Sequence, residues 1–188
     1  MQDRRLLWAL GITAGTAWAV WAYFLFIFGV GTIADPWNPW RIVFYVLLVL
    51  APAISFVPLA LWLRWPLFAP YAVIGWAVFG GLLAFIPPAP EVLSGRLSPL
   101  AHWYFFLALF VVLTTIFAPL AHRIGLRWLT SRTHRGDIVR AWREAGLLSL
   151  YIVGLTVIAS LGLFTWPIAL LSLLFLVLVE ALFLARKS

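Results

Sequence analysis

The sequence predicts an all-α polytopic membrane protein, a bundle of six transmembrane helices, and three observations support this. Of the 188 residues, 65% are hydrophobic and only 10% are charged, whereas a soluble domain carries roughly 25% charged residues. The apolar residues form long runs, and a helix of about 20 apolar residues crosses the hydrocarbon core of a bilayer. The Lys and Arg residues are concentrated in alternate loops, as expected for a chain that crosses a membrane repeatedly.

Six apolar runs within a single transmembrane domain, 1–188, are long enough to be spans. The first follows Arg4 and Arg5 and is longer than the apolar region of a signal peptide, so we expect a span rather than a cleaved leader. Gly162 and Pro167 lie between the last two runs, which predicts a tight hairpin. The runs do not alternate polar and apolar residues, which argues against a membrane barrel. The predicted spans are 6–30, 41–63, 67–87, 100–122, 146–163 and 166–185.

The positive charges predict the orientation. With the amino terminus inside, all of the 13 Lys and Arg residues except Arg41 and Arg96 lie on the cytoplasmic side. This satisfies the positive-inside rule, and the opposite orientation violates it. We therefore expect a multi-pass protein of the cell's inner (cytoplasmic) membrane with both termini cytoplasmic. Many of the 12 Trp residues lie near the ends of runs, where an amphipathic indole is stable at headgroup depth.

Each helix that enters from the predicted outer side begins near a proline, at Pro39, Pro99 and Pro167. Proline is favoured at the first helical position because it lacks only an N–H that would be unpaired there. The second and fourth spans also share an internal proline, Pro58 and Pro119, at an offset of about 60 residues. This similarity allows a repeat of two-helix hairpins, although apolar helices also resemble one another by chance.

The segment 123–145 is predicted to be a basic cytoplasmic loop. Within it, Asp137 can cap a short helix from Ile138 to Ala145. Its apolar and charged residues fall on different faces, which predicts an interfacial amphipathic helix before the fifth span. Because the basic residues flank apolar runs, we expect no nucleic-acid binding. The candidates for contact with anionic lipid are Arg123, Arg127, Arg132, Arg135, Arg140 and Arg143.

Two histidines, His102 and His122, are candidate axial ligands to a haem or a pigment. They lie about 20 residues apart, or about 30 Å along a helix, so they cannot both bind one metal ion. Each would need a second ligand from elsewhere. The alternative interpretation is that both are ordinary polar side chains at the membrane interface, and the identity of any cofactor stays open.

Glu180 is the one acidic residue inside an apolar run. A carboxylate at membrane depth is costly and marks either a function or a specific ion pair. Pairing with an arginine of the inner face, such as Arg64 or Arg123, is the interpretation we favour, and a transport role is the alternative.

Glycines mark predicted packing surfaces on two spans. Gly11 and Gly15 form a Gly-x-x-x-Gly step on the first span, and Gly75 and Gly80 lie on the third. Small residues let helices approach closely, either within the chain or against a partner subunit. No hydroxyl stands in a nucleophile motif, no aspartates are paired for catalysis, and no phosphate-binding loop is present, so we expect no enzymatic activity.

These features leave two hypotheses for function. The first is a non-catalytic structural or accessory subunit of a larger membrane complex, energy-converting or transport. Such a subunit would pack against partner membrane subunits and lipids, and its deep aromatic residues could line a groove for quinone, carotenoid or chlorophyll. The second rests on size and topology, because six helices in so short a chain resemble the substrate-binding subunits of energy-coupling-factor vitamin transporters. That resemblance implies a small-solute-binding transporter component, but the long basic loop and the few polar outer-loop residues depart from it.

Overall fold

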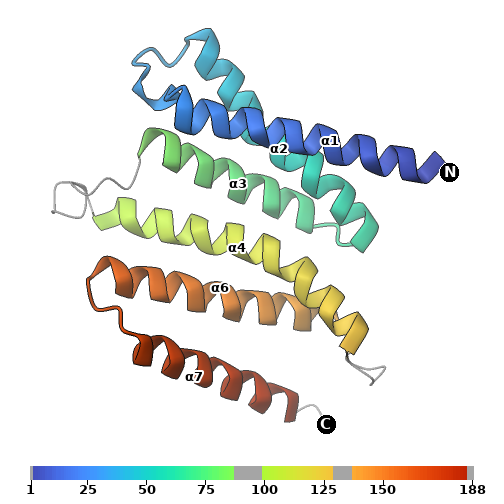
Figure 1. Cartoon of the computed structure of the whole chain (residues 1–188), viewed down its shortest axis with the longest axis vertical. Coiled ribbons are helices and arrows are strands. Elements are labelled where there is room, and N and C mark those ends of the chain that lie inside the picture. The colour runs from blue at the N-terminus through green and yellow to red at the C-terminus, as the bar shows by residue number, and fades with distance from the viewer. Residues whose placement is uncertain (1, 87–98, 129–136, 186–188) are drawn as a thin grey trace. The chain divides into compact units, whose positions relative to one another are not determined.

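A computed structural model describes the backbone of residues 2–86, 99–128 and 137–185, and the side chains of 8–86, 101–127 and 137–183. The described residues form helices and no strand (Figure 1). Among them, six helices are long and apolar enough to cross a membrane. The predicted class, an all-α multi-pass membrane protein with six spans, is therefore confirmed. The chain divides into two compact units, Met1–Ala108 and Leu109–Ser188.

The helix boundaries agree with the predicted spans at most ends. The first span extends beyond α1 through a π-helical segment, Tyr23–Ile27, and a 3-10 turn, Val30–Thr32, with Gly29 between them in the left-handed conformation. The helices are α1 (Gln2–Ala22), α2 (Pro39–Leu63), α3 (Phe68–Phe85), α4 (Pro99–Trp128), α6 (Ile138–Ser160) and α7 (Trp166–Ala185).

The predicted start signals are confirmed for α2 and α6. Pro39 is in the first turn of α2, and the side chain of Asn38 accepts a hydrogen bond of 3.0 Å from the backbone N–H of Trp40. At the start of α6, Asp137 Oδ1 accepts hydrogen bonds from the backbone N–H groups of Val139 and Arg140, at 2.9 and 3.3 Å. These side chains satisfy N–H groups that have no acceptor within the first turn of a helix.

The segment 123–145 was predicted to be a loop with a helix from Ile138 that leads into the fifth span. In the structure α4 continues to Trp128, and α6 runs without a break from Ile138 to Ser160. Gly146 lies where the predicted helix meets the predicted span, and a helical glycine costs about 1 kcal/mol relative to alanine. Burial of Ala141 and Ala145 offsets that cost. The expected amphipathic helix is therefore the first part of a span.

The first unit has an aromatic core where α1, α2 and α3 meet. The helices approach closely at Gly80 of α3, where an added Cβ would lie 2.6 Å from Leu48 Cδ2 and 2.7 Å from Trp21 Cζ2. Nearby, Trp18 donates a hydrogen bond of 2.9 Å from Nε1 to Ser55 Oγ. The core residues are Trp21, Phe24, Val30, Phe44, Leu48, Ala51 and Ala84.

In the second unit, α6 and α7 form the predicted hairpin. Gly162 has a φ of 72°, in the left-handed region that favours glycine, and ends α6. The backbone N–H of Leu163 then bonds the carbonyl of Ile158. Farther into the pair, the Tyr151 hydroxyl donates a hydrogen bond of 3.1 Å to the carbonyl of Ala169. The turn and this bond set the two helices side by side in opposite directions.

Candidate functional site

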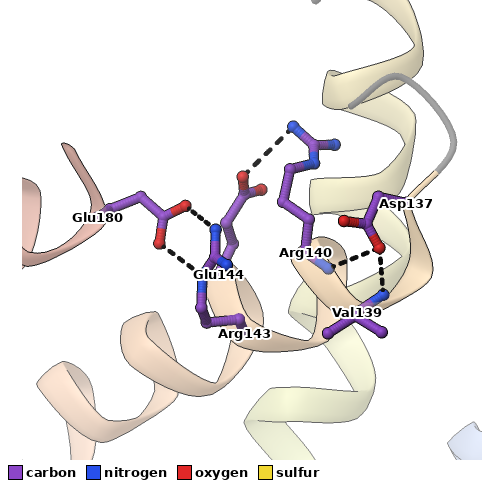
Figure 2. A network of polar contacts seen from close by, with 6 residues as sticks. All are labelled: Asp137, Val139, Arg140, Arg143, Glu144 and Glu180. Carbon is purple, nitrogen blue, oxygen red and sulfur yellow. Dashed lines mark hydrogen bonds and ion pairs between the residues drawn. The ribbon is translucent and has the colours of Figure 1, made fainter. Parts of the chain in front are cut away.

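Near the start of α6 and the last part of α7, and close to the cap residue Asp137, two ion pairs form a group of four charged side chains: Arg140, Arg143, Glu144 and Glu180 (Figure 2). Arg143 donates two hydrogen bonds to Glu180, from Nε to Oε2 at 3.0 Å and from Nη2 to Oε1 at 2.5 Å. The two side chains are 20% and 19% exposed. A bidentate guanidinium–carboxylate pair of this kind is among the strongest hydrogen-bonded contacts in proteins. Within the described part of the second unit, the partner of Glu180 is thus Arg143, an arginine of the predicted inner face other than the two named as examples.

The hairpin explains why these two residues meet. Arg143 precedes Gly162 by nearly the same number of residues as Glu180 follows it. In an antiparallel pair, positions equally far from the turn lie at the same depth. The Arg143 guanidinium also lies 5.0 Å from the centre of the Phe183 ring, one turn beyond Glu180 on α7, which adds a cation–π contact. The nearly equal spacing of Arg143 and Glu180 from Gly162 is the sequence feature that could have predicted this ion pair.

Arg140 is the most buried charge of the group, at 4% exposure. Its Nη1 lies 3.3 Å from Glu144 Oε1, one turn along α6. The guanidinium lies directly against Gly125 of α4, so that a Cβ on Gly125 would overlap Nη2 and Cζ. Gly125 is one turn from the end of α4 at Trp128, where the helix dipole favours a cation. Among the described residues, no acceptor lies within hydrogen-bond distance of Nε or Nη2 of Arg140.

These contacts revise the expected role of two arginines. Arg140 and Arg143 were predicted to contact anionic lipid, but each is engaged with a carboxylate of its own chain. The physical reason is that a charge taken out of water is tolerated when an opposite charge and hydrogen bonds accompany it. Of the other arginines predicted to contact lipid, Arg123 and Arg127 are exposed near the end of α4, while Arg132 and Arg135 lie outside the described residues.

The arrangement is suited to positioning helices. Two arginines and two glutamates give the group no net formal charge, and its contacts link α6 to α4 through Gly125 and to α7 through Glu180. Removal of one partner would leave the other charge uncompensated at membrane depth, which is costly. The group therefore disfavours sliding of α6 along α4 or α7.

A hydroxyl pair lies farther along α4 and α6. Thr114 Oγ1 is 3.2 Å from Ser149 Oγ, and both residues are buried. Each hydroxyl also bonds the carbonyl four residues earlier, Phe110 for Thr114 and Ala145 for Ser149. Such bonds satisfy hydroxyl groups in apolar surroundings and can add a modest attraction between spans.

The structure locates the two histidines and the four glycines that the sequence singled out. His102 and His122 are both partly buried on α4, and no group of three or more potential metal-binding side chains occurs in the part of the chain that the structure describes. The role of either histidine as an axial ligand stays a prediction. Gly75 and Gly80 are buried within the first unit, whereas no described atom lies within 4 Å of an added Cβ on Gly11 or Gly15.

Comparisons of the chain with protein-family models, with curated proteins and with solved structures find no match.

Proposed function

We propose that this chain is a non-catalytic accessory subunit of a larger membrane complex. It packs against partner helices in the cell's inner membrane, with both termini cytoplasmic. The proposal rests mainly on one face of α1, which packs against the chain's own helices at one end and lacks any described neighbour at the other.

The packed end of this face is at Trp18. Its ring centroid lies 4.7 Å from that of Trp76 of α3, and its Nε1 bonds Ser55 of α2. Gly11 lies two turns earlier and Gly15 one turn earlier on the same face, given the period of 3.6 residues. No described atom comes within 4 Å of a Cβ added at either glycine. The face that contacts protein at Trp18 thus continues uncovered toward the amino terminus.

A partner helix fits the uncovered part better than lipid alone. Glycine lowers helix stability by about 1 kcal/mol relative to alanine, and it contributes within a membrane when another backbone approaches closely. Four charges in the second unit pair with one another, as Arg140–Glu144 and Arg143–Glu180. The paired charges are thus used inside the chain, while small residues face outward. This arrangement favours a subunit that packs against the helices of a partner.

Replacement of Gly15 by Leu tests this proposal. The new side chain would hold a partner helix away from α1, and we expect the fraction of the chain recovered in the large assembly to fall at least about tenfold, equivalent to about 1.4 kcal/mol. The measurement is native gel electrophoresis after mild detergent extraction, with the co-migrating chains identified by mass spectrometry.

Thr13→Leu is the matched control. Thr13 is exposed on the other side of α1, and its hydroxyl bonds only the carbonyl of Ala9 in the same helix. We expect this variant to assemble like the natural chain. The proposal fails when the natural chain itself migrates as a monomer, or when Gly15→Leu and Thr13→Leu assemble equally well.

A further inference from the structure

A groove with a volume of about 480 Å³ lies along the carboxyl-terminal part of α4, within the second unit. Its lining combines two guanidinium groups with three apolar side chains. The lining residues are Leu120, Arg123, Ile124, Leu126 and Arg127.

From this groove we infer a binding site for an anionic phospholipid. Arg123 and Arg127 are one helical turn apart, so their side chains share one face of α4. Both are exposed. Two guanidinium groups on one face can donate several hydrogen bonds to the oxygens of one phosphate.

The apolar part of the lining selects a lipid over a free anion. Leu120 and Ile124 are 51% and 58% exposed; along the span Leu120 precedes both arginines, and Ile124 lies between them. The groove runs from the apolar Leu120, toward the middle of the span, to Arg127 at the end of the span, and this order of its two ends matches that of acyl chain and phosphate in a phospholipid. The occupant that fits this order is one phospholipid with a net negative headgroup.

The four arginines of the second unit whose side chains the structure describes lie in two places. Arg140 and Arg143 pair with Glu144 and Glu180, and Arg123 and Arg127 line the groove. Near an anionic membrane surface, each arginine contributes about a fivefold increase in affinity. A double variant, R123Q/R127Q, is thus expected to weaken binding at least tenfold.

The test uses the full chain, purified in detergent and titrated with dioleoyl-phosphatidylglycerol, dioleoyl-phosphatidylcholine or inorganic phosphate. Native mass spectrometry measures the affinity for each lipid. We expect phosphatidylglycerol to bind at least tenfold more tightly than phosphatidylcholine, and R123Q/R127Q to lose that preference. Circular dichroism and thermal unfolding of R123Q/R127Q verify that the double variant is folded.

The matched control is R64Q/K187Q, which removes the same net charge elsewhere in the chain. It should keep the preference for phosphatidylglycerol. Equal loss in the two double variants would mean that binding follows net charge and not this groove, and would overturn the inference. Phosphatidylcholine binding as tightly as phosphatidylglycerol, or full competition by inorganic phosphate, would also overturn it. None of these outcomes depends on whether a partner subunit binds α1.

Discussion

Replacing Glu180 by Gln is expected to lower the free energy of unfolding by about 2–3 kcal/mol. The substitution keeps the shape of the side chain but leaves the Arg143 guanidinium, which is 20% exposed, without its carboxylate. Breaking a fully buried ion pair costs about 3–5 kcal/mol, and partial exposure lowers that figure. Denaturation by sodium dodecyl sulfate in mixed micelles, followed by circular dichroism, measures the loss.

Two further variants make this prediction specific. Asp35→Asn is the same acid-to-amide change in a turn where Asp35 accepts a hydrogen bond from the backbone N–H of Trp37, and we expect it to cost at most about 1 kcal/mol. The charge exchange R143E/E180R should recover part of the stability lost in Glu180→Gln, because it restores opposite charges at the same depth. Stability of Glu180→Gln equal to that of the natural chain would contradict the pair.

Replacing Gly80 by Leu is expected to cost at least about 3 kcal/mol. Even a single Cβ at this position would come within 2.7 Å of both Leu48 and Trp21, which are buried in the first unit. Overpacking of a close-packed core costs typically about 1–3 kcal/mol for a few added atoms, and a whole leucine side chain exceeds that. Thermal unfolding monitored by tryptophan fluorescence reports on this core directly, since Trp21 is part of it.

The adjacent glycine supplies the control. No described atom lies within 4 Å of a Cβ added to Gly81, so Gly81→Leu should be neutral or slightly stabilising because leucine favours a helix. The two variants have the same composition and differ only in which face of α3 carries the leucine. If they unfold at the same temperature, the contact of Gly80 with α1 and α2 is not the one described.

Local sequence signals predicted much of the fold. Asn38 with Pro39, and Asp137 before Ile138, marked helix starts that the structure places at the same residues. Gly162 marked the hairpin because its left-handed conformation suits glycine. The first part of α6 reads as amphipathic in the sequence, and only the tertiary burial of residues such as Ala141 shows how closely it packs.

The candidate site was less predictable for a physical reason. An arginine beside a membrane span has the same local sequence signature whether it binds a lipid or a carboxylate of another helix. Arg140 is buried because Gly125, distant in sequence, leaves room for its guanidinium. The hairpin geometry sets Arg143 as the partner of Glu180. The position of Glu180 near the inner end of its span had suggested Arg64 or Arg123. An arginine that binds a lipid is distinguished from one that pairs with a carboxylate only by the depth of its side chain along the helix.

The most direct test of the account is the side of the membrane on which the basic segment lies. The chain contains no cysteine, so single cysteines at Arg96 and Arg132 can be labelled separately in cells with a membrane-impermeant maleimide. We predict that Arg96→Cys is labelled in intact cells and that Arg132→Cys is labelled only after permeabilisation. Labelling of Arg132→Cys in intact cells would contradict the six-span orientation on which the proposed function depends.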